Sequence, residues 1–204
     1  MLEAHDLAAR RGHARLFEGL SFTVEAGHAL VVTGANGTGK TTLLRMLAGL
    51  SQPEAGEIRW DGTRVAPFDP AVRASIAFAG HLPALKDELT TEENLDAMVT
   101  LAGATASPEA VRGALDAVAL ASRRALPARV LSQGQRRRIG LARLSLLARP
   151  LWILDEPVTA LDAAGTGMLT DMIAAHLDRG GLAVAATHAP LALPVARIHS
   201  ITLS

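Results

Sequence analysis

The sequence of 204 residues contains no cysteine and no tyrosine, and aromatic residues make up only 3% of it. The absence of cysteine excludes disulfide bonds and thiolate metal sites, which suits a reducing compartment. Lysine plus arginine and aspartate plus glutamate each number 20, so the formal net charge is zero. This balance gives no electrostatic reason to expect a nucleic acid or an anionic membrane surface as a partner.

Long hydrophobic runs are also missing. No stretch approaches the roughly 20 apolar residues that cross a bilayer, and the opening MLEAHDLAARRGHARLF lacks the apolar segment of a secretory signal. We therefore expect a soluble protein that serves a membrane, if at all, through a partner. Hydrophobic residues still make up 49% of the chain, which is enough for the core of one domain with a small lobe.

Strands and helices alternate along most of the chain. Apolar or alternating patterns predict strands at 21–25, 29–33, within 53–62, and at 75–79, 151–155, 182–187 and 197–203. Helical patterns cover 41–50, 132–148 and 166–178, and a helical region extends from about 82 to 131. In that region Thr90 and Glu93 form a capping box, and Ser107 with Pro108 starts a helix.

This order of elements predicts an α/β fold with a parallel sheet. The short strands at the start predict a small β subdomain, and the region at about 82–148 predicts an inserted helical lobe.

A glycine-rich segment, GANGTGKT at 34–41, matches the phosphate-binding pattern G-x-x-x-x-G-K-[ST] in full. It follows a predicted strand and opens a predicted helix, so its backbone N–H groups and the helix N-terminus can bind phosphate oxygens. Lys40 would place its charge near the β- and γ-phosphates, and the Thr41 hydroxyl would ligate Mg²⁺. The predicted nucleotide-binding residues are Gly34, Ala35, Asn36, Gly37, Thr38, Gly39, Lys40, Thr41 and Thr42.

A second segment, LWILDE, carries two acidic residues at the end of an apolar strand. Open α/β sheets place their ligands at this end of the strands. Asp155 would hold Mg²⁺ through water or through Thr41, and Glu156 would orient and deprotonate an attacking water. Alone, such a strand end is a common surface feature, but after a phosphate-binding loop it predicts a catalytic site.

Three further motifs complete the pattern: LSQGQ at 131–135, ALD at 160–162 and ATH at 186–188. With the two segments above, and in this order, they resemble the ATP-binding cassette (ABC) ATPases over essentially the whole chain. The resemblance implies the P-loop NTPase fold of that family, with its N-terminal antiparallel β subdomain, and a dimer that sandwiches two ATP molecules.

The same resemblance implies roles for residues outside the phosphate-binding loop. Ser132 and Gly134 would contact the γ-phosphate bound to the opposite subunit, as parts of a signature formed by Leu131, Ser132, Gln133, Gly134 and Gln135. Asp162 would lie at the dimer seam, and His188 would act as a catalytic residue that contacts the γ-phosphate and the attacking water.

Three positions depart from the family pattern. Gln133 replaces the more usual glycine, which requires only that its backbone avoid positive φ. Arg11 stands where an aromatic residue usually stacks on adenine; a guanidinium plane can stack on a base, while the neighbouring Phe17 is an alternative better suited to the core. His81 stands where glutamine usually contacts Mg²⁺ and water, so we predict a metal-site and coupling role for His81.

Charged residues near these motifs allow two interpretations. The three arginines at 136–138 follow the signature, and a solvated helix face is favoured over a nucleic-acid patch because the net charge is zero. Lys86, Asp87 and Glu88 are too polar for the core. They form either a solvated turn or a lever that reports the nucleotide state to a partner.

The segment at residues 80–94 points to one group of proteins within this family. Gly80, His81, Pro83, Lys86, Leu89, Thr90, Glu93 and Asn94 follow a spacing that resembles the ATP-binding subunits of bacterial haem exporters in cytochrome c maturation. This resemblance implies an ATPase docked on integral membrane subunits at the cytoplasmic face of the inner membrane, with hydrolysis linked to release of a haem-loaded chaperone. No histidine of the chain has the context of a haem ligand.

Other functions remain open at this point. The chain could serve another small ABC exporter, or be a non-transport ABC protein, although those generally carry two cassettes or a long coiled-coil insertion. A P-loop kinase or GTPase is disfavoured because those folds do not need LSQGQ.

Overall fold

The computed structural model of the protein describes residues 1–81, 83–188 and 191–204. It divides into two compact units. The first contains Met1–Phe78, Arg149–Pro157 and Ile173–Ser204, and the second contains Ala79–Ala148 and Val158–Met172. Residue 82, where the predicted helical lobe begins, lies outside the described residues.

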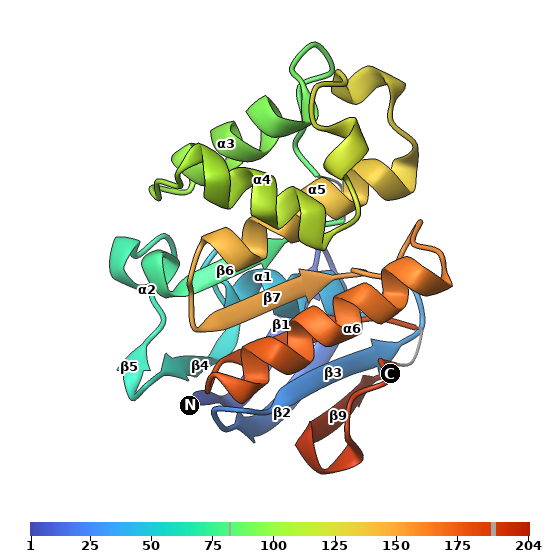
Figure 1. The fold of residues 1–204 in the computed structure, drawn as a ribbon. Coiled ribbons are helices and arrows are strands. Elements are labelled where there is room, and N and C mark those ends of the chain that lie inside the picture. The colour runs from blue at the N-terminus through green and yellow to red at the C-terminus, as the bar shows by residue number, and fades with distance from the viewer. Residues whose placement is uncertain (82, 189–190) are drawn as a thin grey trace. The chain divides into compact units, whose positions relative to one another are not determined.

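Two sheets build the first unit (Figure 1). An antiparallel sheet has the order β2-β1-β4-β5, and a second sheet has the order β6-β7-β8-β3-β9, in which β3 runs parallel to β8 and β9, and β7 parallel to β8. The predicted α/β class with a parallel sheet and an antiparallel β subdomain is therefore confirmed. The strands are β1 (Leu2–Arg11), β2 (Ala14–Val24), β3 (Ala29–Gly34), β4 (Ala55–Trp60), β5 (Thr63–Arg64), β6 (Ile76–Ala79), β7 (Leu151–Asp155), β8 (Leu182–Ala186) and β9 (Ile198–Leu203).

The core of the first unit follows from the apolar patterns of these strands. All five residues of β7 and of β8 are buried, as expected for central strands of a parallel sheet covered on both faces. Helix α1 (Lys40–Leu47) adds Leu43, Leu44 and Leu47, each fully buried, to the same hydrophobic cluster. This packing holds the start of α1 beside the carboxyl ends of β3 and β7.

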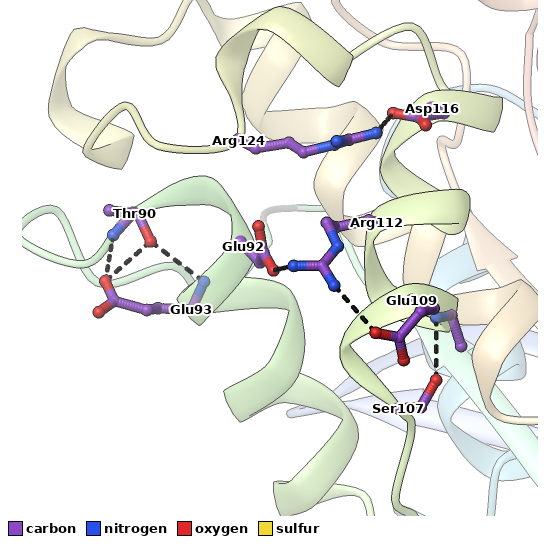
Figure 2. A network of polar contacts seen from close by, with 9 residues as sticks. Thr90, Glu92, Glu93, Ser107, Glu109, Arg112, Asp116 and Arg124 are labelled. Carbon is purple, nitrogen blue, oxygen red and sulfur yellow. Dashed lines mark hydrogen bonds and ion pairs between the residues drawn. The ribbon is translucent and has the colours of Figure 1, made fainter.

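Helices dominate the second unit. Helices α3 (Thr91–Leu101) and α4 (Pro108–Ala117) both pack on α5 (Gln133–Leu146) (Figure 1). The capping predictions are confirmed: the Thr90 hydroxyl accepts the Glu93 amide while the Glu93 carboxylate accepts the Thr90 amide, and Ser107 accepts the Ala110 amide (Figure 2). The buried faces carry apolar residues that are fully inaccessible, namely Leu95, Val99, Leu115, Ile139 and Leu144.

The helices differ from the sequence-based expectations in three places. The region from 82 to 131 is not helical throughout, because between α3, α4 and α5 the described chain forms only the 3-10 turns Ala121–Arg123 and Ala128–Val130. Helix α2 (Pro70–Ser75) was not predicted, although Asp69 caps it through the Ala71 amide and Pro70 occupies its first turn. Helix α6 (Ala163–Asp178) begins three residues before its predicted start at 166.

Within the described residues, no helix combines the length and apolar character that crossing a bilayer requires.

A buried histidine supports the sheet from α6. His176 stacks on Trp152 with ring centroids 4.0 Å apart, and its Nε2 lies 3.1 Å from the Pro150 carbonyl oxygen and 3.3 Å from that of Leu182. A Cβ on Gly181 would lie 2.3 Å from the imidazole ring. Burial lowers the pKa of His176, an effect partly opposed by the two carbonyls, so the folded protein favours the neutral ring.

We expect the free energy of unfolding to fall as the pH falls below about 6.5, the ordinary pKa of histidine. A lowered pKa means that the unfolded chain takes up a proton before the folded protein does, so the stability supplied by neutral His176 is complete above that pH and is lost below it. Urea unfolding between pH 8 and pH 5 measures this slope. The matched variant His176→Phe keeps a ring on Trp152 but cannot titrate, and its curve should be flatter. Equal slopes in both proteins would show that other groups control the acid response.

Candidate nucleotide-binding and catalytic site

The phosphate-binding loop connects β3 to α1 and depends on glycine at two close approaches. Gly34 has φ 139°, and a Cβ at this position would lie 2.4 Å from the Leu203 carbonyl oxygen of the neighbouring strand β9. Gly39, with φ 102°, precedes the first residue of α1 and packs against Leu16 and Phe17. Thr38 closes the loop by donating its hydroxyl to the Ala35 carbonyl over 3.0 Å. These contacts hold the backbone N–H groups of the loop at the start of the helix.

Lys40 and Thr41 begin α1 and point to different partners. Lys40 is 7% exposed, and its ammonium donates to the carbonyl oxygens of Gly34 at 2.7 Å and Ala35 at 3.0 Å. The Thr41 hydroxyl lies 3.2 Å and 3.0 Å from the two carboxylate oxygens of Asp155. The charge of one residue and the hydroxyl of the next are therefore both held at the loop.

The acidic residues stand at the end of β7. Asp155 is its last residue and is 4% exposed, whereas Glu156 is partly exposed and has φ 47°, a left-handed conformation that costs an L-residue about 1–2 kcal/mol. The Glu156 amide donates to the Ala186 carbonyl at the end of β8 over 2.9 Å. Its Oε1 lies 3.5 Å from Nε2 of His188, which follows β8.

A cavity of about 210 Å³ brings most of these residues together. Predicted site residues account for nine of its ten lining residues; the tenth, Leu16 on β2, was not predicted. Leu16 lies two residues after the start of a strand, and no motif marks it. Phe17 is only 9% exposed and belongs to the core, as expected. The lining is Arg11, Leu16, Asn36, Gly37, Gly39, Lys40, Thr41, Thr42, Asp155 and Glu156.

Arg11 is predicted to stack on adenine, and its place in the cavity lining supports this role. We expect Arg11→Ala to weaken ATP binding by about 1 kcal/mol, or about fivefold, in the range of exposed cation–π contacts. Titration calorimetry measures the difference. Arg10→Ala is the matched control, because Arg10 is the preceding residue of β1 and pairs instead with Glu54 at 3.0 Å. Equal ATP affinities in the two variants would show that Arg11 does not contact adenine.

The signature residues start α5 through a capping box. The Ser132 hydroxyl accepts the Gln135 amide at 3.2 Å, and the Gln135 side chain accepts the Ser132 amide at 3.0 Å. A Cβ on Gly134 would lie 2.6 Å from the Ala160 carbonyl oxygen. Gln133 is the first helical residue and is not among the positive-φ residues. The motif therefore has a local structural role beside the one predicted toward a nucleotide.

Asp162 precedes α6 and is fixed by two donors. Its Oδ1 accepts the Gly165 amide at 2.8 Å and the Arg138 guanidinium at 2.8 Å. The Gly165 amide, followed by Arg138, lowers the pKa of the Asp162 carboxyl. The carboxylate therefore stays ionised at the start of the helix.

The interpretation of the three arginines as a solvated helix face is wrong for the middle one. Arg137 is 5% exposed and donates through Nη1 to the carbonyl oxygens of Gly80 at 2.6 Å and His81 at 2.8 Å. Arg136 pairs with Asp87, and Arg138 pairs with Asp162. The His81 side chain itself is exposed.

Comparison with known proteins identifies the family. The family described as ABC transporter matches residues 17–159, which is more than half of the chain. The chain belongs to the ABC transporter family. This finding confirms the resemblance to ABC ATPases that the motifs predicted, and with it the ATPase class and the binding of ATP.

Two similar proteins share nearly the whole length of the chain. A protein of Dechloromonas aromatica, named cytochrome c biogenesis ATP-binding export protein CcmA, is 49% identical, with 100% of each chain covered. A protein of Nitrosomonas europaea with the same name is 45% identical and covers 100% of this chain and 96% of its own.

Solved structures show the same fold. A structure from Pyrococcus furiosus described as an ABC transporter ATP-binding protein has a TM-score of 0.85 and 26% identity, with 99% of this chain and 96% of that chain covered. A dimeric ATP-binding cassette bound to ADP and phosphate has a TM-score of 0.81 over 93% of this chain and 88% of its own. At 21% identity, the second likeness is one of fold alone.

Proposed function

We propose that this chain is the ATP-hydrolysing subunit of a membrane ABC complex that acts in cytochrome c biogenesis, the system named in its relatives. One observation carries the catalytic part of the proposal: Thr41, Asp155 and Glu156 line one cavity with the phosphate-binding loop, and His188 lies 3.5 Å from the Glu156 carboxylate. Whole-length identity of 49% to a CcmA protein supports the biological part. In this proposal both units belong to one ATP-binding domain that spans residues 1–204.

Residues of the first unit have separate roles in ATP hydrolysis. Lys40 neutralises the β- and γ-phosphates, which the loop amides also bind. Glu156 accepts a proton from the attacking water, and His188, 3.5 Å from its carboxylate, contacts the γ-phosphate.

A magnesium ion fits the oxygen donors of Thr41 and Asp155, since Mg²⁺ prefers hydroxyl, carboxylate and water oxygens. When bound, it would neutralise charge on the phosphates. The metal-site role that the resemblance implies for His81 stays part of the proposal.

A second copy of the chain completes each site. The signature residues, through Ser132 and Gly134 at the start of α5, bind the γ-phosphate held by the partner copy, and the helix dipole favours this contact. Asp162 lies at the seam between the copies. Its ionised carboxylate at the start of α6 is the feature that supports a polar contact there.

The membrane partners in this proposal are integral membrane subunits of the CcmB and CcmC type. The chain docks on them at the cytoplasmic face of the bacterial inner membrane, as a peripheral subunit, and hydrolysis drives release of a haem-loaded chaperone. Lys86 and Glu88 are exposed, while Asp87 between them is paired with Arg136 inside the second unit. Lys86 and Glu88 are therefore the two charges of this loop that can meet a partner.

Affinity purification from detergent-solubilised membranes tests the proposal. In a bacterium that matures c-type cytochromes, the tagged chain should co-purify with integral membrane subunits that mass spectrometry identifies. The double variant Lys86→Glu with Glu88→Lys should lose these partners and should impair cytochrome c maturation, while the ATPase rate of the purified subunit stays unchanged.

A matched control exchanges an exposed ion pair elsewhere. Arg15 and Glu18 pair on β2, and Arg15→Glu with Glu18→Arg keeps a pair there. This control should retain the partners. Recovery of the native chain without membrane subunits would contradict the membrane assignment, and full complementation by the Lys86 and Glu88 variant would show that the loop is a solvated turn.

A further inference from the structure

Three consecutive arginines at the start of α5 bond to two segments of the second unit, one on each side of the helix in the sequence. Successive helix positions differ by about 100° around the axis, so neighbouring side chains fan out instead of sharing one face. Arg136 pairs with Asp87, Arg137 donates to the carbonyls of Gly80 and His81, and Arg138 pairs with Asp162. The helix that begins with the signature is therefore bonded to segments before and after it in the chain.

The segment at residues 80–90 receives bonds from two of the three arginines. We call it the switch segment and define it as Gly80, His81 and residues 83–90. Arg137 secures one end. The residue is only 5% exposed, and a buried charge requires hydrogen-bond partners, two of which are the Gly80 and His81 carbonyls at 2.6 Å and 2.8 Å. In the same part of the segment, Pro83 lies close to Gly140, where an added Cβ would be 3.3 Å away.

The other end of the switch segment is fixed by Arg136 and by the chain just before α5. Arg136 reaches the Asp87 carboxylate and also donates from Nε to the Ala128 carbonyl over 3.1 Å. The Arg129 amide donates to the Asp87 carbonyl at 3.1 Å, and the Ala128 amide to the Leu89 carbonyl at 2.9 Å.

Buried Asn94 on α3 completes this attachment. Its side-chain amide donates to the carbonyls of Lys86, Leu89 and Thr90, each at 3.0 Å, and its Oδ1 accepts the Lys86 amide at 2.8 Å. These bonds satisfy backbone groups of the switch segment from a buried side chain. The segment is thus a bonded part of the helical unit, and only its exposed side chains project outward.

We propose that Arg136 and Arg137 are positioning residues that fix the switch segment to the signature helix, so that the two respond to ATP as one body. The inference rests on the proposed function, in which the signature binds the partner's ATP and the switch segment meets the membrane subunits. A displacement of α5 would then carry His81, Lys86 and Glu88 with it. Neither arginine touches the nucleotide in this scheme.

Hydrogen exchange of the purified chain, read by mass spectrometry, tests the attachment without membrane partners. In the nucleotide-free protein, Arg137→Gln should speed exchange at the amides of Leu85 and Lys86 by about tenfold or more, because one neutral amide replaces two charged hydrogen bonds. Arg112→Gln is the matched control. Arg112 on α4 pairs with Glu92 of α3 and with Glu109 of its own helix (Figure 2), and its loss should leave those amides unchanged.

Swapping the charges of Arg136 and Asp87 gives a second test that does not depend on the folding of the Arg137 variant. Arg136→Asp should speed exchange at the Arg129 amide by up to about fivefold, as for a partly exposed ion pair. Adding Asp87→Arg to Arg136→Asp should restore the native rate. Unchanged rates in Arg137→Gln, or a double variant that is no better than the single one, would overturn the proposal.

Hydrogen exchange in the presence of ATP tests the positioning role of the arginines separately from the proposed ATP dimer. In a Glu156→Gln parent, ATP should slow exchange both at 131–140 and in the switch segment, whereas in Glu156→Gln with Arg137→Gln only 131–140 should respond. A switch segment that still responds would overturn the positioning role. If 131–140 fails to respond in the parent, the proposed ATP dimer is wrong, and the nucleotide-free rates alone then decide whether the arginines hold the segment.

Discussion

Glu156→Gln should slow ATP hydrolysis by roughly 10²–10⁴, the usual contribution of a positioned general base, while ATP affinity changes little. Glutamine has the same shape but cannot accept the proton of the attacking water. The backbone bond from residue 156 to the Ala186 carbonyl and the left-handed φ of 47° do not depend on the carboxylate. A steady-state phosphate-release assay, together with calorimetric titration of ATP, measures the two effects separately.

The same variant should accumulate an ATP-bound dimer, because the ATP that bridges the two copies is no longer hydrolysed. Light scattering with and without ATP reveals it. Glu25→Gln is a suitable control, since Glu25 is an exposed glutamate outside the cavity lining. Native turnover in Glu156→Gln would assign the base to another residue, and an unchanged mass with ATP would contradict the proposed dimer.

The position of Glu156 explains why it suits this role. A left-handed conformation is rarely adopted by residues with a side chain, and it persists where the surrounding structure determines it. Here the end of β7 turns sharply, and the bond to β8 holds the turn. The carboxylate is thereby directed toward His188 and the phosphate-binding loop.

Much of the fold could be predicted because its signals are local. A continuous apolar run such as LWILD predicts a buried strand by itself. The glycines at 34 and 39 predict a loop that only glycine can form, and the contacts of Gly34 with β9 give the physical reason. Likewise, Thr90 with Glu93 marks a helix start that the structure confirms.

The candidate site was predictable as far as contiguous motifs define it. Lys40, Thr41, Asp155 and Glu156 were expected together because each ends or begins an element at the carboxyl edge of one parallel sheet. Leu16 was not expected, because a leucine in a strand carries no chemical signal and reaches the cavity only through the pairing of β1 with β2. The S-x-x-Q pattern also marks Ser132 with Gln135 as a helix cap, a role that the structure adds to the one expected toward ATP.

The burial of Arg137 could not be predicted from the sequence. A run of three charges on a helix usually faces solvent, and zero net charge supported that interpretation for Arg136, Arg137 and Arg138. Burial of Arg137 depends on the carbonyls of Gly80 and His81, which lie more than fifty positions earlier in the chain, and no pattern of residues reveals which backbone oxygens will meet a side chain. The stacking of His176 on Trp152 is a tertiary contact of the same kind, which no local pattern marks.

Lys40→Ala should weaken ATP binding by about 2–5 kcal/mol, or about 30-fold or more, because a buried ammonium that faces phosphate oxygens is lost. The substitution also removes the bonds that the Lys40 ammonium donates to the carbonyls of Gly34 and Ala35, so the shape of the loop loses support in addition to its charge. Titration calorimetry of ATP and of ADP measures the loss. The effect should be larger for ATP, since Lys40 is expected near the γ-phosphate as well as the β-phosphate.

The chain offers a close control for this test, because Lys86 is its only other lysine. Lys86 is exposed and belongs to the second unit, so Lys86→Ala removes the same charge from the protein without touching the phosphate-binding loop. Its ATP affinity should equal that of the native chain, whereas Lys40→Met, which keeps most of the length of the side chain, should bind as poorly as Lys40→Ala. Retention of native affinity in Lys40→Met would show that packing of the side chain, and not its charge, supports the loop.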